Sequence, residues 1–183
     1  NLVIYEYNSP FKKELLKIKK LSFSPIIIPT FKKINFIIPS IHISDPYLYI
    51  FEDEDEKFNF LNPYFLKKQV SINNIVSAII YNIKITGGLA DFTDRSKGKI
   101  FHKTLKNIDA DITLALPSSL KIKSSFLVEG LAKTKLEIIS KYNFAAKFFE
   151  SKIKVTNLDP MEFGIYYKNS LTILIKKALI NAE

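Results

Sequence analysis

Two aspartates beside the only arginine give this chain its best case for acid–base chemistry. Asp91 and Asp94 stand three residues apart and Arg95 follows them. Paired carboxylates of different pKa can serve as general acid and general base. In an extended segment, however, side chains three residues apart point to opposite faces of a sheet. We therefore expect Asp94 to cap the following turn through its side chain and to pair with Arg95.

The two histidines offer little further chemistry. His42 and His102 each lie in an alternating segment, on the side opposite the apolar residues. An imidazole acts as a base or a metal ligand when a positioned partner orients it. Because the local sequence provides no such partner, we interpret both as isolated, solvated side chains. The chain also lacks G-x-S-x-G and G-x-x-x-x-G-K motifs, so we predict no catalytic residue and no enzymatic activity.

Five consecutive acidic residues, Glu52 to Glu56, invite a metal-site interpretation, since hard cations take carboxylate oxygens. A calcium loop interleaves its carboxylates with carbonyl donors and needs a glycine for its sharp turn, whereas this run has no glycine. Contiguous like charges are typical of a solvated hairpin tip. We predict a hairpin tip here, and neither a metal nor another cofactor.

Composition bounds the remaining possibilities. The chain has 183 residues, is 47% hydrophobic and contains no cysteine, which excludes a disulfide framework, a thiolate metal site and a cysteine nucleophile. No apolar run approaches the roughly 20 residues that span a bilayer. We expect a section of a longer protein, with any anchor or targeting signal outside it.

The formal net charge of +9 raises the question of nucleic acid. Only one of the 27 basic residues is arginine, and base readout and phosphate clamping both favour the guanidinium fork. We therefore expect no specific nucleic-acid binding. The lysines instead fit outward-facing positions that protect a sheet, as predicted for Lys121, Lys123, Lys152 and Lys154.

The elements that must position all these side chains are mostly strands. Apolar and polar residues alternate with a period of two in most of the chain, which indicates strands with one apolar face. The clearest examples cover 34–38, 41–43, 83–85, 108–116, 120–128, 134–140, 153–155 and 171–175, and extended structure is also expected over 89–94. Gly87 and Gly88 permit positive φ and are expected to break the pleat.

Helices are expected to be few and short. Ser9-Pro10 could begin one, although a strand over Leu16 to Phe23 competes with it. Behind Ser71, the apolar residues from Ile72 to Ile80 follow helical spacing, although their branched side chains also suit a strand. Asn157 opens a turn or short helix that reaches Tyr167.

Three short motifs in order carry a resemblance to a known family. The first is Pro46-x-Leu48, followed by the acidic turn and Phe58-Asn59. The second is G-x-x-x-F-x-D from Gly88 to Asp94, followed by L-x-N-I-D-A-D-I from Leu105 to Ile112. The third is Asn157-Leu158-Asp159, which leads to the pair Tyr166-Tyr167. Together they resemble the AsmA-like superfamily of bacterial cell-envelope proteins, in its domain-of-unknown-function branch.

The resemblance implies a fold class and a location. The fold would be mainly β, an extended twisted antiparallel sheet curled into a groove with one or two short helices; the alternative is a closed β-sandwich. Residues 1–183 would form a single section, with possible sub-units 1–68 and 69–183. The protein would face the periplasm and be anchored in the inner membrane through a segment outside this section.

The apolar strand faces need a cover, because so few helices are predicted. Pro117-Ser118-Ser119 joins the two cleanest alternating strands, which should pair antiparallel with their apolar sides together. With the resemblance, this predicts a lipid-contacting surface made of Ile108, Ile112, Leu114, Ile122, Phe126 and Val128.

Two functions follow for such a surface. The first is binding or conducting the acyl chains of phospholipids, in support of outer-membrane lipid homeostasis. The second is a non-enzymatic scaffold in an envelope-spanning assembly, whose partners would be other envelope proteins or neighbouring sections of the same chain. A closed core or a buried subunit contact would favour the scaffold.

Overall fold

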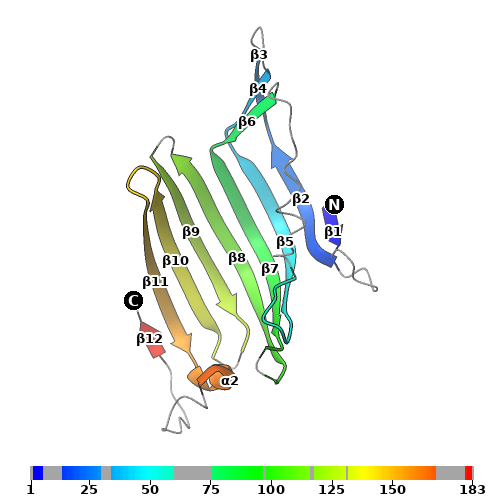
Figure 1. Ribbon diagram of the computed structural model, residues 1–183, viewed down its shortest axis with the longest axis vertical. Coiled ribbons are helices and arrows are strands. Elements are labelled where there is room, and N and C mark those ends of the chain that lie inside the picture. Colours follow the sequence, from blue (N-terminus) through cyan, green and yellow to red (C-terminus); the bar gives the residue numbers. More distant parts are fainter. Residues whose placement is uncertain are drawn as a thin grey trace.

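The part of the chain that the structure describes consists mostly of strands (Figure 1). The computed structural model describes residues 2–5, 14–29, 34–59, 76–96, 98–115, 118–130, 132–167 and 180–182. The main sheet has nine strands in the order β1-β2-β5-β7-β8-β9-β10-β11-β12. They are β1 (Leu2–Tyr5), β2 (Glu14–Phe23), β5 (Ile41–Glu52), β7 (Asn82–Asp94), β8 (Phe101–Ala115), β9 (Ser119–Val128), β10 (Thr134–Asn143), β11 (Phe148–Leu158) and β12 (Ile180–Ala182).

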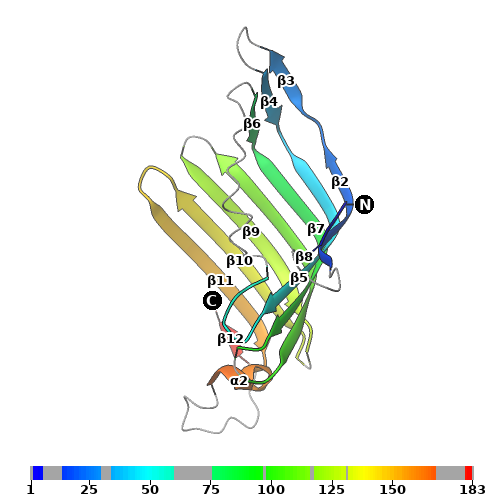
Figure 2. The same ribbon diagram turned by 45° about the vertical axis from the view of Figure 1, so that its right-hand side comes forward.

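A second sheet of three strands continues one part of the main sheet. Its strands are β3 (Ile26–Pro29), β4 (Ile34–Ile38) and β6 (Val76–Ile80), in the order β3-β4-β6. Each is separated by only one or two residues from a strand of the main sheet: β3 from β2, β4 from β5 and β6 from β7. These three long, interrupted strands carry the fold beyond the rest of the sheet (Figure 2).

The predicted antiparallel arrangement holds for most pairs, but not for all. β5 pairs with β7 and β4 with β6 in parallel. Parallel neighbours arise because the chain returns to its starting end between β5 and β6 before it forms the next long strand. The sheet is therefore mixed. It is also open, with β1 and β12 at its two edges, and the closed sandwich is not what forms.

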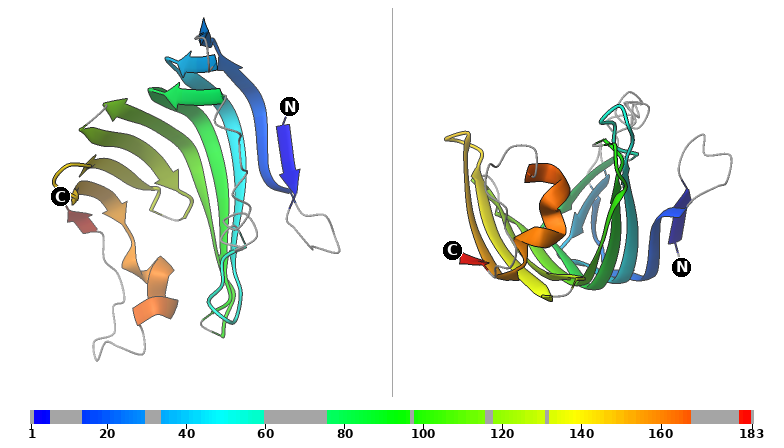
Figure 3. Two further views of the ribbon diagram at one scale, coloured as in Figure 1. Left: turned by 45° about the horizontal axis from the view of Figure 1, so that its top comes forward. Right: turned by 90° about the horizontal axis from the view of Figure 1, so that it is seen from below.

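The main sheet is strongly curled, with a short helical segment inside the curve (Figure 3). This segment comprises the 3-10 turn η1 (Pro160–Phe163) and the helix α2 (Gly164–Tyr167). We call the side that faces the segment the concave face and the opposite side the convex face. The lower end of the sheet, as drawn in Figure 1, holds η1 and α2. The upper end holds the β8–β9 and β10–β11 turns.

A line of irregular residues crosses the middle of the sheet. Asp45 in β5, Gly87 in β7 and Asn107 in β8 have φ values of 48°, 65° and 52°, in the left-handed region that glycine, asparagine and aspartate tolerate best. The β7–β8 register shifts on both sides of Gly88, and the β8–β9 register shifts after Lys106. Such bulges bend strands and increase their twist, which helps the sheet to curl.

The bulges also keep apolar side chains on one face. In β8 the bulge at Asn107 inserts one residue, so Leu105 and Ile108 both face the concave side although they are three positions apart. Gly88 sits against Ile108, since a Cβ at this glycine would lie 3.1 Å from the Ile108 Cβ. The glycine thus allows two strands to approach closely at the bend.

Two other predictions are decided by the described residues. The helix predicted over Ile72 to Ile80 is wrong for Val76–Ile80, which form β6; residues 71–75 lie outside the described part. Branched side chains favour a strand once a partner strand is present. Near the N-terminus, the strand alternative is confirmed by β2. The proposed helix start at 9–13 and the strand at 171–175 fall outside the described residues.

The acidic run forms the predicted hairpin tip. Its Asp53 carboxylate accepts hydrogen bonds from the backbone N–H groups of Asp55 and Lys57, both at 2.9 Å. Glu56 takes a positive φ of 60°, and Glu52 bridges to Phe58 across the turn. The tip lies at the lower end of the sheet (Figure 1).

Candidate functional site

The six residues predicted to form one apolar surface share the concave face. Ile112 lies opposite Ile122 in the β8–β9 register, and Val128 lies opposite Leu105. Phe126 is paired with Leu136 of β10, which extends the same face toward β11. The antiparallel pairing predicted across the Pro117-Ser118-Ser119 turn is therefore confirmed.

The apolar surface continues across the neighbouring strands. Register places further apolar side chains in line with these six on the concave face, namely Ile41, Ile43, Ile83, Ile85, Leu120, Leu136, Ile138, Ile153 and Val155. Most remain partly accessible to solvent, and Ile153 is 48% exposed. Among the described residues, the buried aliphatic and aromatic side chains are those of Leu15, Ile18, Ala90, Phe101 and Val128, and Pro160 of η1 is buried as well. The concave face is thus apolar but largely uncovered.

At the lower end, η1 and α2 close the concave face with aromatic contacts. The ring of Phe101 lies 5.1 Å from that of Tyr166 and 5.7 Å from that of Phe163, measured between centroids. Pro160 at the start of η1 and the side chain of Asp159, which accepts from the Met161 N–H at 2.9 Å, fix the segment. Phe101 is 7% exposed as a result.

A buried carboxylate ties this segment to β7. Asp94 is 1% exposed, and its Oδ2 accepts a hydrogen bond from the Tyr166 hydroxyl at 2.6 Å. Its Oδ1 accepts from the Ser96 N–H at 2.7 Å, so the predicted turn cap is confirmed. Burial and the bond to the Asp94 carboxylate raise the pKa of the Tyr166 phenol. Arg95 instead lies over the Phe51 ring, 5.4 Å from its centroid, and the predicted ion pair between Arg95 and Asp94 is not found among the described contacts.

A nearly buried ion pair lies next to this contact. Lys103 and Glu162 form a salt bridge with side chains only 14% and 11% exposed. The Lys103 ammonium also lies 5.7 Å from the Phe163 ring centroid. The Glu162 carboxylate packs directly over Gly130, where any side chain would overlap it. The lower end is therefore held by specific polar contacts within an apolar surrounding.

The upper end carries no comparable closure among the described residues. Tyr142 and Phe144 form an edge-to-face pair at 5.4 Å beside the β10–β11 turn. Phe148 and Phe149, which follow this turn, are 59% and 60% exposed. Large aromatic side chains therefore stand in solvent where the concave face opens.

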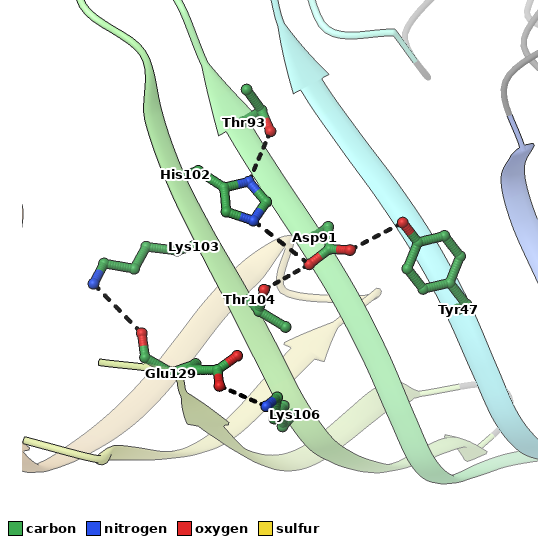
Figure 4. Close-up of polar contacts among 8 residues, drawn as sticks. All are labelled: Tyr47, Asp91, Thr93, His102, Lys103, Thr104, Lys106 and Glu129. Atoms are coloured by element: carbon green, nitrogen blue, oxygen red, sulfur yellow. Dashed lines mark hydrogen bonds and ion pairs between the residues drawn. The ribbon is translucent and has the colours of Figure 1, made fainter. Parts of the chain in front are cut away.

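On the convex face, a polar cluster links three strands (Figure 4). Asp91 of β7 accepts hydrogen bonds from the Tyr47 hydroxyl of β5 at 3.0 Å and from the Thr104 hydroxyl of β8 at 2.6 Å. Burial and the contact with Asp91 raise the pKa of Tyr47 to about 12. Asp91 and Asp94 thus point to opposite faces, as their spacing predicts.

His102 joins this cluster, and its interpretation as isolated is wrong. Its Nδ1 lies 3.0 Å from the Thr93 hydroxyl and its Nε2 lies 3.9 Å from Asp91. The set has the residue types of a nucleophile, a base and a carboxylate, but an orienting carboxylate must hydrogen-bond the base. The 3.9 Å separation is too long for such a bond. The contacts instead connect strands whose pairing brings together residues that lie far apart in the sequence.

His42 and the lysines stand on the convex side as predicted. His42 is paired with Lys84, and its Nε2 lies 3.1 Å from the Ser40 hydroxyl, so its interpretation as isolated is wrong as well. The register places Lys121, Lys123, Lys152 and Lys154 on the face opposite Ile122, and all four are exposed.

Neither a metal centre nor a membrane-spanning helix is found in the described part of the chain. Histidines and acidic residues do not gather there in groups of three or more that could hold a metal ion. None of the helices described is long and apolar enough to cross a bilayer.

Sequence reasoning missed the contacts that close the lower end. Lys103 and Glu162 are 59 residues apart, and Asp94 and Tyr166 are 72 residues apart. The one available signal was the pair Tyr166-Tyr167 after the Asn157-Leu158-Asp159 motif, which marked the segment without identifying its partners. Comparison of the sequence with protein-family models and with curated proteins finds no match, so the AsmA-like resemblance stays a hypothesis that rests on its motifs.

Proposed function

We propose that the concave face binds the acyl chains of lipids along the strand direction. The observation that carries this proposal is a mostly apolar face on a curled sheet, which is interrupted by Ser124, Ser140 and Ser151 and remains partly accessible to solvent. Apolar area of this extent is normally covered in a soluble protein or marks an interaction site. An acyl chain would gain about 0.8 kcal/mol for each methylene group it buries there.

The dimensions of the sheet suit such a ligand. β9 has 10 residues, which at about 3.3 Å per residue extend over roughly 33 Å. The hydrocarbon core of a whole bilayer is about 30 Å thick, so a fully extended acyl chain fits within the length of the face. The curl of the sheet favours acyl-chain binding over a scaffold role, because a narrow ligand can contact both walls of a curved sheet at once.

The cellular setting is proposed on the resemblance alone. Within it, the protein is part of a periplasm-facing envelope protein that carries phospholipid chains toward the outer membrane. A scaffold role would use the same face for a protein partner, and the lipid content of the purified protein distinguishes the two.

Lipid bound by the purified protein can be identified by mass spectrometry of its organic extract. Leu114→Asp places a carboxylate on the concave face, whereas Thr113→Asp places one on the convex face of the same strand. Loss of two or three methylene contacts, about 2 kcal/mol, lowers the affinity roughly 30-fold. We expect lipid in extracts of the wild type and of Thr113→Asp, and little in extracts of Leu114→Asp, with circular dichroism unchanged.

Two results would argue against this function. Lipid-free extracts of all three proteins would favour the scaffold. Unfolding of Leu114→Asp would show that residue 114 lies in a closed core, where an unpaired carboxylate is strongly destabilising.

A further inference from the structure

The upper end of the sheet combines exposed aromatic side chains with lysines. We use the name upper rim for Phe144, Lys147, Phe148 and Phe149 around the β10–β11 turn, together with Lys121 and Lys141 at the adjoining ends of β9 and β10. The three phenylalanines are 38%, 59% and 60% exposed. Phe149 is paired with Tyr142 and Phe148 with Asn143, so successive aromatic rings leave the hairpin on opposite faces. Material packed on one face of the sheet can therefore cover Phe148 or Phe149, but not both.

We propose that the upper rim docks on the surface of an anionic lipid bilayer. Phenylalanine is among the apolar side chains that interfacial protein segments bury at the boundary between headgroups and acyl chains, and lysines beside it are attracted to anionic headgroups. The proposal goes beyond acyl-chain binding, because it states which end of the sheet meets the membrane. Docking at this end directs the open end of the concave face toward the bilayer.

The charges of the rim are arranged to favour an anion. Lys121 and Lys141 lie directly opposite each other in the β9–β10 register, and like charges in this position repel. Glu150 is the cross-strand partner of Lys141 on its other side. Within the described residues, none of Lys121, Lys141 and Lys147 forms a salt bridge. A layer of anionic headgroups would relieve the repulsion between these lysines.

The opposite end has the charge that an anionic surface repels. Glu54, Asp55 and Glu56 are exposed at the acidic hairpin tip, which lies at the lower end of the sheet (Figure 1). Basic residues at one end and an acidic tip at the other orient the protein with its upper rim toward the bilayer. The strand β3 extends from the same upper side, with Ile26, Ile27 and Ile28 exposed by 52%, 58% and 42%.

The absence of tryptophan from the chain allows a direct test. Phe148→Trp places a single indole in the upper rim, and Ile100→Trp places one at the lower end, where Ile100 is 67% exposed. Each protein is mixed with phosphatidylcholine vesicles in which a substantial minority of the lipid is phosphatidylglycerol. We expect the indole emission of the Phe148→Trp protein to shift to the blue and to be quenched by brominated lipid. The emission of the Ile100→Trp protein should stay unchanged.

Lysine substitutions test whether the charges of the upper rim contribute to binding of anionic headgroups. Lys141→Gln with Lys147→Gln removes two charges from the rim, and Lys99→Gln with Lys133→Gln removes two from the lower end. Each lysine near an anionic surface contributes about a fivefold change in affinity. The rim pair should therefore weaken vesicle binding about 25-fold, and the lower-end pair should leave it nearly unchanged. Pure phosphatidylcholine vesicles should bind all the proteins weakly.

Three results would overturn the proposal. The first is an equal emission shift for the Phe148→Trp and Ile100→Trp proteins, and the second is an equal effect of the two lysine pairs. The third is a shift in the Phe148→Trp protein that depends on protein concentration without vesicles, which would assign the rim to contact between copies of the chain. These outcomes are separate from the test of acyl-chain binding. A protein that carries lipid but fails to dock contradicts only the membrane assignment.

Discussion

The two ends of the curled sheet differ in how far their apolar side chains are covered. Each end leaves apolar strand faces that water contacts unfavourably. At the lower end, η1 and α2 cover Phe101 and bury the carboxylate of Asp94 against Tyr166. At the upper end, Phe148 and Phe149 stay more than half exposed.

This difference indicates that the lower end contributes mainly to the stability of the fold and the upper end mainly to binding. Contacts at the lower end are buried, paired and long-range in sequence, so their loss should lower the free energy of unfolding. Side chains at the upper end make few protein contacts to lose. The comparison predicts that substitutions at the lower end lower the free energy of unfolding, whereas substitutions at the upper end weaken binding to membranes.

The largest effect is expected for Lys103→Met. The substitution removes the ammonium group from a nearly buried ion pair with Glu162, and breaking a buried ion pair typically costs about 3 kcal/mol or more. The matched control is Lys106→Met, whose partner Glu129 lies at 2.6 Å in a pair with side chains 45% and 54% exposed. An exposed pair contributes at most about 1 kcal/mol. Urea unfolding curves measure both, and equal losses would show that the lower end is not the stabilising one.

A smaller loss is expected for Tyr166→Phe. Asp94 would keep its bond to the Ser96 N–H but lose the one from the phenol, at a cost of about 1–2 kcal/mol for a buried acceptor. Tyr81→Phe, on an exposed residue near the upper end, should change stability by less than about 0.5 kcal/mol. If both variants unfold at the urea concentration of the wild type, the Asp94–Tyr166 contact does not hold the segment in place.

Alkaline pH should weaken the lower half of the sheet through Tyr47. Its pKa is about 12 in the folded protein, against about 10 for a phenol in an unfolded chain. The stabilisation from the neutral phenol is complete below about pH 10. It is lost as the pH rises toward the folded pKa, because the unfolded state releases its proton first. Tyr47→Phe should flatten this part of the stability profile, and an unchanged slope would show that another group titrates there.

The smallest stability change is expected at the upper end. Phe149→Ser removes a side chain that is 60% exposed, so the free energy of unfolding should change by less than about 0.5 kcal/mol. The same variant should bind anionic vesicles more weakly than the wild type. A stability loss above about 2 kcal/mol would mean that Phe149 belongs to a packed core.

The fold class and the shared apolar face were predictable because both depend on local alternation. Residues such as Ile112 and Ile122 have a period of two on each side of a short turn, which fixes their common face. The parallel pairing of β5 with β7 was not predictable in this way, because it depends on the path of the chain between them.

The motifs were more informative about bends than about chemistry. Asn107 takes the positive φ of a bulge, and Gly88 allows the close approach of Ile108. The carboxylate of Asp109 accepts a hydrogen bond from the Gly87 N–H at 3.0 Å. Contacts such as Lys103–Glu162 could not be predicted, because nothing in a single sequence specifies which distant side chains meet on a curved sheet.

Photocrosslinking on β9 tests the central claim most directly. A photoreactive amino acid is placed at Phe126 on the concave face or at Ser125 on the convex face, and the protein is illuminated in lipid-containing cells or vesicles. We predict lipid adducts at position 126 and not at position 125, since adjacent residues of a strand point to opposite faces. Equal labelling at both positions, or protein adducts alone at position 126, would contradict acyl-chain binding by the concave face.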